Sequence, residues 1–228
     1  MRTASIFLKK KMNTDIAHFL DNSQIHYLKK VMKIKDDEKF YTFDGNGLRG
    51  LCILTSDSKL KVLDINEEER KYHSCVIIPL LKKTRFEYAL QKCVELGIKN
   101  IVTYISYKAR DKYDFSKELT RQYRYKEIIK SAFLQSENYY LPDIEMSEFL
   151  FDIDFENFKN PIFLDQNESS NLNGDENVDA IVVGGEFGYH EKEIEFLEKQ
   201  KNIRSFRVSS NILRVETAPV VALAKLNY

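Results

Sequence analysis

Apolar and polar residues in the N-terminal part of the chain follow patterns typical of short β-strands. Two apolar runs, at residues 40–43 and 51–54, flank the sequence Asp-Gly-Asn-Gly at 44–47, which is a strong turn signal between paired strands. Residues 60–65 alternate apolar and polar side chains, as a half-buried strand does. Before this hairpin, the apolar spacing at residues 25–34 predicts a short helix that follows an N-terminal strand. We therefore expect a small barrel of antiparallel strands.

The hydrophobic pattern changes after Cys75, where the apolar positions fall into short, mostly continuous runs. These runs stand at residues 76–81, 101–105, 161–164, 180–183 and 205–208. Helical segments separate most of them. Continuous apolar strands that alternate with helices are typical of a parallel sheet covered on both faces. The pattern predicts an α/β domain in the C-terminal part of the chain.

Several helices of this second part have recognisable ends. Thr84 and Glu87 match a capping box at the start of an amphipathic helix, and Gly97 supplies its left-handed stop. Other helices are expected at residues 117–136, after Tyr189, and from Pro219 onwards.

The composition and charge narrow the class of protein. The 228 residues include 35 basic and 35 acidic ones, so a surface for a polyanion requires local segregation of charge. No apolar run approaches the roughly 20 residues that span a bilayer, and the N-terminus lacks the pattern of a secretory signal. We expect a soluble, cytoplasmic protein without a membrane partner. The cysteines and histidines lack the spacing of metal ligands, so we expect no metal.

Two segments near the C-terminus carry the strongest functional signal. Residues 182–189 run from an apolar strand into a glycine-rich bend, and residues 212–218 contain Arg214 and Glu216 just before a helix. Glycines at the carboxyl end of a strand let backbone amides approach a ligand closely. In open α/β sheets, ligands bind at that edge. The two segments together therefore predict a ligand site.

Motifs distributed over nearly the whole chain point to one family. In chain order they are His26-Tyr27-Leu28, Phe43-Asp44-Gly45, Lys82-x-x-Arg85-x-Glu87, Glu95-Leu96-Gly97, Ile212-Leu213-Arg214 and Glu216-Thr217-Ala218. Their order and spacing resemble the RsmE family, the bacterial methyltransferases that act on N3 of a uridine in small-subunit (16S) ribosomal RNA. This family belongs to the SPOUT class.

The resemblance implies a fold and a cofactor. It implies a PUA-like RNA-binding β-barrel at residues 1–72, then a SPOUT methyltransferase domain at residues 73–228, an α/β fold whose parallel sheet contains a deep trefoil knot. It also implies a homodimer and S-adenosylmethionine as the methyl donor. The cofactor is expected to lie against Leu164, Val183, Gly184, Gly185, Gly188, Val208, Ser209, Ile212 and Leu213.

The chemistry of methylation suggests roles for the charged residues of these segments. Uridine N3 carries a proton that must leave before or during attack, and a carboxylate or a cation can assist. We expect Arg214 to stabilise charge and position the substrate, with Glu216 or Glu186 orienting it or acting as base. A structural pair between Arg214 and Glu216, or a helix cap, is the alternative.

RNA binding requires Lys and Arg side chains that reach phosphates. Lys29, Lys33, Lys82 and Arg85 lie within the family-like motifs and are the expected contacts. A further basic cluster joins Lys108 with Arg110 and Lys112, although such runs are commonly solvated faces.

The glycine-rich bend departs from the family pattern. The family's loop usually reads Gly-Pro-Glu-Gly-Gly, whereas this chain has Gly184-Gly185-Glu186-Phe187-Gly188. Two alternative functions stay open, and the altered loop bears on the second of them. One is a SPOUT methyltransferase with a different RNA target, and the other is a non-catalytic RNA-binding relative.

Overall fold

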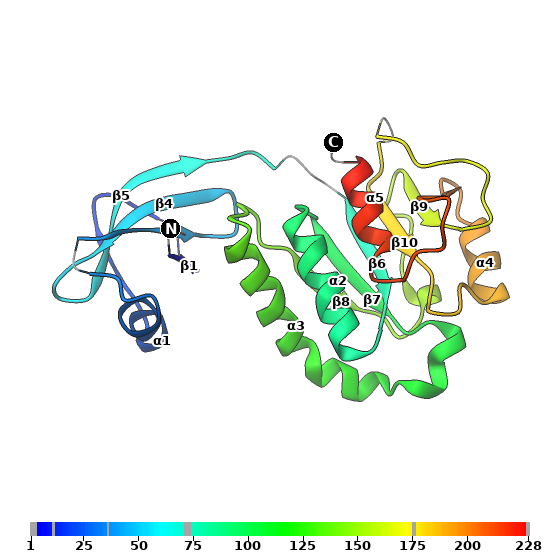
Figure 1. Cartoon of the computed structure of the whole chain (residues 1–228), viewed down its shortest axis with the longest axis horizontal. Coiled ribbons are helices and arrows are strands. Elements are labelled where there is room, and N and C mark those ends of the chain that lie inside the picture. The colour runs from blue at the N-terminus through cyan, green and yellow to red at the C-terminus, as the bar shows by residue number, and fades with distance from the viewer. Residues whose placement is uncertain (1–3, 11, 36, 71–73, 175–176, 227–228) are drawn as a thin grey trace. The chain divides into compact units, whose positions relative to one another are not determined.

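The protein is described by a computed structural model that covers residues 4–10, 12–35, 37–70, 74–174 and 177–226 (Figure 1). The chain divides into two compact units. One consists of Met1–Lys71 and Phe133–Leu141, and the other of Tyr72–Ala132 and Pro142–Tyr228. The first unit thus includes a segment from the middle of the chain, which the sequence pattern did not indicate.

A mixed β-sheet forms the N-terminal unit. Its strands follow the order β1-β3-β4-β5-β2. Their bounds are β1 Ser5–Phe7, β2 Ala17–Phe19, β3 Lys39–Phe43, β4 Leu48–Leu54 and β5 Lys59–Glu67. The predicted hairpin is confirmed, since β3 and β4 pair antiparallel across the turn. The prediction of antiparallel strands throughout is wrong, because β1 pairs parallel with β3.

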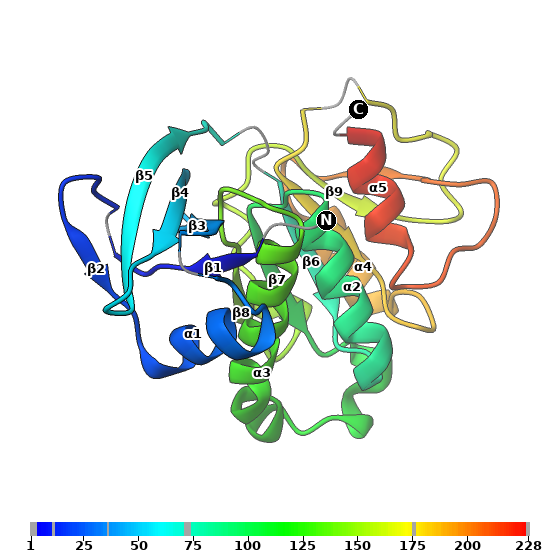
Figure 2. The ribbon, with the colours of Figure 1, turned by 60° about the vertical axis from the view of Figure 1, so that its left-hand side comes forward.

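The predicted short helix of this unit is also present. It consists of α1 (Asn22–His26) and a π-helical turn, η1 (Tyr27–Val31), and Figure 2 shows it beside the sheet. Asp21 caps the start of α1 by accepting a hydrogen bond from the backbone N–H of Gln24. Leu28 is fully buried and joins the core formed by the strands.

Aromatic packing explains why residues 133–141 belong to the N-terminal unit. The ring of Phe133 meets Phe7 and Phe43 edge-on, with ring centroids 6.1 and 5.8 Å apart. The backbone N–H of Gly47 donates to the carbonyl of Tyr139 at 3.0 Å.

A parallel sheet forms the centre of the second unit, as the continuous apolar runs predicted. Its strand order is β11-β9-β10-β6-β7-β8, and every neighbouring pair runs parallel. The bounds are β6 Cys75–Pro79, β7 Asn100–Tyr104, β8 Asp143–Met146, β9 Pro161–Leu164, β10 Ala180–Val183 and β11 Arg204–Phe206.

The helical segments of the second unit are α2 Lys83–Glu95, η2 Tyr107–Lys112, α3 Phe115–Gln135, η3 Leu150–Asp152, α4 Glu191–Glu198 and α5 Ala218–Leu226. The last three residues of α3 belong to the first unit. Helix α2 begins at Lys83 without a side-chain cap, so the predicted capping box at Thr84 is wrong. Its partner Glu87 instead accepts a hydrogen bond from Arg124 Nε at 2.8 Å. The predicted stop is confirmed, since Gly97 has φ +78°.

The helical segments pack on the sheet through apolar side chains. On one face, Val102 and Val182 of the sheet cluster with Leu197 of α4 and Leu150 of η3. Helices α2 and α5 contact each other, and α5 also contacts β10 (Figure 1). None of the helices in the described ranges is long and apolar enough to cross a membrane.

Candidate functional site

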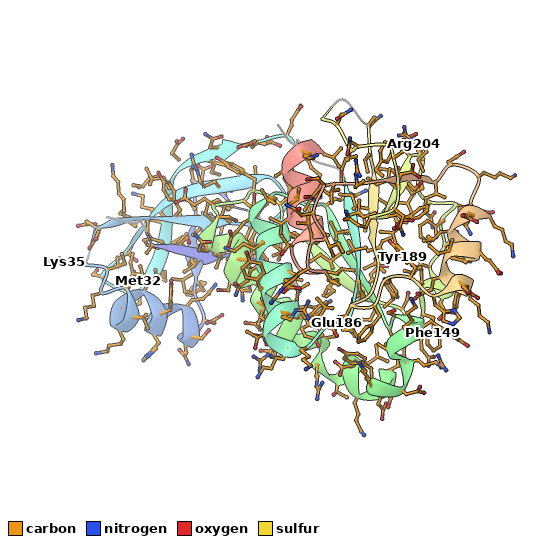
Figure 3. All side chains as sticks on the ribbon, turned by 45° about the vertical axis from the view of Figure 1, so that its right-hand side comes forward. Met32, Lys35, Phe149, Glu186, Tyr189 and Arg204 are labelled. Atoms are coloured by element: carbon orange, nitrogen blue, oxygen red, sulfur yellow. The ribbon has the colours of Figure 1, made fainter. Side chains whose placement is uncertain are left out.

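A cavity of about 760 Å³ lies at the carboxyl ends of the strands β9 and β10. Its walls come mainly from the segments that follow β9, β10 and β11, and the last of these segments leads into α5 (Figure 3, where Glu186 and Tyr189 are labelled). Because these strands are parallel, the segments after them start from the same edge of the sheet. The predicted site residues that line this cavity are Arg85, Leu164, Val183, Gly184, Gly185, Glu186, Gly188, Val208, Ile212, Leu213 and Arg214.

The glycines that open the loop after β10 are required by close packing. A Cβ atom at Gly184 would lie 3.0 Å from the ring of Tyr189, and one at Gly185 would lie 2.5 Å from Ser106 Oγ. Tyr189 is held in place because its hydroxyl donates to the carbonyl of Val182 at 3.0 Å. Burial raises the pKa of Tyr189 well above its usual value, so this hydroxyl stays protonated and donates. Glycine thus lets the loop lie directly against its neighbours.

The far end of the same loop is a tight turn anchored by a lysine. Gly188 has φ +69°, and its N–H donates to the carbonyl of Gly185 at 2.9 Å. Lys108, from η2, donates from Nζ to the carbonyl of Phe187 at 2.8 Å. Lys108, which belongs to η2, therefore holds the backbone of this loop in place, while the Phe187 side chain is 60% exposed.

Arg85, in the first turn of α2, connects the two functional segments. Its guanidinium donates to both oxygens of Glu216, from Nε to Oε1 at 2.9 Å and from Nη2 to Oε2 at 2.6 Å. Its third nitrogen, Nη1, donates to Oε1 of Glu186. One side chain thus holds the glycine-rich loop and the segment before α5 together by a bidentate pair and a single ion pair.

The pairing sets the ionisation of these groups. Hydrogen bonding to Glu216 raises the pKa of Arg85, against an opposing effect of burial. Burial by itself raises the pKa of Glu216, but the hydrogen bonds from Arg85 and the nearby positive charge outweigh it, and the net pKa lies below the usual value. Glu216 is therefore an anion at neutral pH, with both oxygens engaged.

Arg214 is placed differently from Arg85. Its side chain is 78% exposed, and its Nη1 lies 4.0 Å from Glu216 Oε1. Arg214 also lines the cavity. The bidentate partner of Glu216 is Arg85, and Arg214 makes only this longer contact with it.

Ser209 lies beside the cavity. Its carbonyl accepts a hydrogen bond from Gln166 Nε2 at 3.4 Å, and its hydroxyl accepts one from the N–H of Asn211 at 3.1 Å. Gln166 lines the cavity, so the segments after β9 and β11 are linked at this point.

The residues expected to contact RNA fall in two places. Lys29 and Lys33 belong to the N-terminal unit, where Lys29 donates to Ser58 Oγ at 2.8 Å and Lys33 has φ +55°. Lys82 directly precedes α2, and Arg85 lines the cavity. From the sequence, Arg85 was expected to contact a phosphate of the RNA. In the structure, the three nitrogens of its guanidinium donate hydrogen bonds to the carboxylates of Glu216 and Glu186.

Several residues of the site were missed by the sequence analysis. They are Gln166, Tyr189 and Lys108, which support or line the loops. Lys108 had a signal as part of a basic cluster, and Tyr189 closes the segment 182–189 that carried the functional signal. In the described residues, no group of three or more His, Cys, Asp or Glu side chains could hold a metal ion.

Family models match almost the whole chain. Residues 20–65 match the model described as an RNA methyltransferase PUA domain, and residues 67–227 match the model described as an RNA methyltransferase domain. The two matches follow each other with almost no gap.

Individual proteins are similar over comparable lengths. The ribosomal RNA small subunit methyltransferase E 1 of Borreliella burgdorferi is 29% identical over 214 residues, which cover 89% of this chain and 89% of that protein. The ribosomal RNA small subunit methyltransferase E of Bacillus subtilis is 25% identical over 236 residues, which cover 92% of this chain and 89% of that protein. The resemblance to the RsmE family is thereby confirmed.

Solved structures share the fold. The ribosomal RNA small subunit methyltransferase E of Neisseria gonorrhoeae, bound to S-adenosyl methionine, superposes with a TM-score of 0.84 at 23% identity and covers 98% of this chain and 96% of that one. A predicted RNA methyltransferase of Thermotoga maritima has a TM-score of 0.69 at 26% identity, covering 98% of this chain and 96% of that one. Together with the match over residues 67–227, which is more than half of the chain, these similarities show that the protein belongs to the RNA methyltransferase family.

Proposed function

We propose that the protein transfers the methyl group of S-adenosylmethionine to N3 of a uridine in small-subunit ribosomal RNA. The observation that carries this proposal is the cavity at the carboxyl edge of the sheet, in a chain of the RNA methyltransferase family. Relatives named ribosomal RNA small subunit methyltransferase E supply the substrate class.

The residues present fit this cofactor. The volume of about 760 Å³ lies within the range of about 300–1,000 Å³ that is typical of small-molecule sites. Leu164, Val183, Val208 and Leu213 provide apolar walls for an adenine ring. The loop of residues 184–188 lines the cavity and is fixed by close packing of Gly184 and Gly185 against Tyr189 and Ser106, so its backbone amides and carbonyls can meet the edge of the base. The solved relative from Neisseria gonorrhoeae contains this cofactor.

The cofactor, when bound, supplies an electrophilic methyl group on a sulfonium, so that transfer is an in-line displacement at carbon. The protein contributes alignment and the control of one proton. We assign Arg214 to the substrate, because it is exposed at the cavity and its guanidinium can stabilise negative charge on a uridine oxygen as the N3 proton leaves.

Glu216 and Glu186 act as positioning residues in this proposal. Both oxygens of Glu216 accept hydrogen bonds from Arg85, and its lowered pKa makes it a poor proton acceptor near neutral pH. Glu186 is also bound to Arg85. The N3 proton passes to solvent, to the RNA or to another group at the cavity, and Arg85 keeps the two loops in register.

The wider architecture is part of the proposal. Residues 1–72 act as the PUA-like RNA-binding domain, with Lys29 and Lys33 near phosphates, and residues 73–228 act as the SPOUT methyltransferase domain, with Lys82 at its RNA side. We further propose a trefoil knot in the C-terminal domain, a homodimer, and a location in the cytoplasm, where ribosomal RNA is modified.

Two measurements test the proposed function. Isothermal titration calorimetry with S-adenosylmethionine is expected to show binding, and small ribosomal subunits that lack the modification are expected to accept a labelled methyl group. The variant Arg214→Gln is expected to retain cofactor binding and to lose most of the transfer rate, because Arg214 is assigned to the substrate. An absence of binding at millimolar cofactor would contradict the enzyme and favour a non-catalytic RNA-binding protein.

A further inference from the structure

The loop after β10 exposes an aromatic ring next to the cavity. Phe187 is 60% exposed and lines the cavity. A phenylalanine side chain in contact with solvent lacks the free energy that burial would provide, so its exposure at a ligand site indicates a role in binding. The loop that carries this ring is held at two points. Lys108 donates to the backbone carbonyl of Phe187, and Arg85 pairs with the side chain of Glu186. The ring is thus presented outward from a rigid support.

Positive charge surrounds this ring. Lys112 Nζ lies 4.6 Å from the centroid of Phe187. The segment η2, Tyr107–Lys112, contains three basic residues and one acidic residue, Asp111, in a chain whose formal net charge is zero. Asp111 lies 4.0 Å from Arg110 Nε and offsets part of the charge of that residue. Lys108 and Lys112 contact Phe187 and place two positive charges beside it, while the neighbouring Glu186 is paired with Arg85.

Single-stranded RNA matches this combination of features. Aromatic side chains bind unpaired bases by stacking, and neighbouring lysines bind the flanking phosphates. We propose that Phe187 and Lys112 form a nucleotide-stacking site in which a base of the substrate RNA lies on the face of the Phe187 ring opposite Lys112, and Lys112 contacts an adjacent phosphate. The site rests on the proposed function for the identity of the RNA, and it would hold an unpaired nucleotide beside Arg214 at the cavity.

The absence of tryptophan from the chain allows a direct test. The variant Phe187→Trp places a single tryptophan, which can be excited selectively over the tyrosines, at the stacking position, and Tyr123→Trp places one at an exposed position on α3 as a control. A short single-stranded, uridine-rich RNA is the probe, and its binding is measured independently by the fluorescence anisotropy of labelled RNA. Stacking predicts that the RNA quenches Phe187→Trp over the same concentration range as it binds, and leaves Tyr123→Trp unchanged.

Affinity measurements with the tryptophan-free chain complete the test. Phe187→Ala is expected to raise the Kd for the RNA by about 5- to 150-fold, the range that corresponds to one base–aromatic stack, while Phe187→Tyr stays close to the wild type. Lys112→Gln is expected to reduce the magnitude of the slope of log Kd against log salt concentration by about 0.7, the value for one contact with a single-stranded phosphate. Lys159→Gln, just before β9 at the opposite edge of the sheet from the cavity, is expected to leave that slope unchanged.

The outcomes separate this inference from the proposed function. If Phe187→Trp is not quenched, or if Phe187→Ala binds RNA as well as the wild type, the stacking site is overturned while methyl transfer stands. If Phe187→Ala instead changes the oligomeric state in sedimentation and leaves RNA affinity intact, a second copy of the chain covers the ring and the inference is again overturned. If stacking is observed and no methyl transfer occurs, the proposed function fails and the RNA site stands.

Discussion

The ion pair between Arg85 and Glu216 predicts a measurable loss of stability when the arginine is removed. Replacing Arg85 with Met keeps the aliphatic stem and leaves the Glu216 carboxylate without its bidentate partner. The Glu216 side chain is only 9% exposed and that of Arg85 is 30% exposed. Breaking a fully buried pair costs about 3–5 kcal/mol, and breaking a surface pair costs about 0–1 kcal/mol. For this partly exposed pair we expect about 2–3 kcal/mol.

The loss should appear as a shift in thermal unfolding. A destabilisation of about 2–3 kcal/mol corresponds to a decrease in Tm of about 4–12 °C for a chain of this size, measured by differential scanning calorimetry. Arg124→Met is the matched control, because its pair with Glu87 is more exposed, at 50% and 22% for the two side chains, and should cost less than about 1 kcal/mol. Adding Glu216→Gln to Arg85→Met should recover part of the loss, since no buried charge is then left unpaired.

The pH dependence follows from the lowered pKa of Glu216. A carboxylate whose pKa is lower in the folded state stabilises the fold above its unfolded pKa and loses that contribution as the pH falls through the folded pKa. The Tm difference between wild type and Arg85→Met should therefore be constant near neutral pH and shrink in acid, starting above about pH 4.5, the ordinary value for a glutamate, because burial raises the pKa of the unpaired Glu216 in the variant. A Tm change at Arg85 no larger than at Arg124, or one independent of pH in this window, would refute the reasoning.

Further predictions concern the loops and the core. Gly184→Ala should cost about 1–3 kcal/mol and weaken cofactor binding in calorimetry, because the new Cβ would lie 3.0 Å from the ring of Tyr189. Gly188→Ala should cost about 1–2 kcal/mol in thermal unfolding through its positive φ alone, since no atom lies within 4 Å of the added Cβ. Tyr104→Phe should cost about 1–3 kcal/mol in the same assay, because the buried carbonyl of Val183 loses the donor that lies at 2.7 Å. Cys93, whose pKa burial raises to about 12, and the other buried cysteines should react with a thiol reagent at pH 8 only after unfolding; rapid labelling of the native protein would contradict their placement.

The features predicted correctly from the sequence are those that depend on local patterns. Continuous apolar runs indicated the parallel sheet, because strands covered on both faces have no polar side to alternate with. The stop at Gly97 and the turn between β3 and β4 follow from backbone geometry that glycine favours. The cavity walls were also predictable, since the carboxyl ends of parallel strands meet at one edge.

The features that were missed depend on contacts between distant parts of the chain. Arg85 and Glu216 are 131 positions apart, and nothing local distinguishes an arginine that binds a carboxylate from one that binds a phosphate. The parallel pairing of β1 with β3 and the return of Phe133 to the N-terminal core are likewise long-range. The capping box failed because α2 begins at Lys83, which places Thr84 inside the helix and not at its cap, and Glu87 pairs with Arg124 instead.

The central claim is methyl transfer to uridine N3, and one measurement tests it most directly. Small-subunit ribosomal RNA that lacks the modification is incubated with the protein and S-adenosylmethionine that carries a deuterated methyl group, then digested to nucleosides and analysed by mass spectrometry. The proposed function predicts deuterated N3-methyluridine as the labelled nucleoside, at a level that falls sharply with Arg214→Gln. Label on a ribose 2′-hydroxyl or on another base, or no label although the protein binds the cofactor, would contradict it.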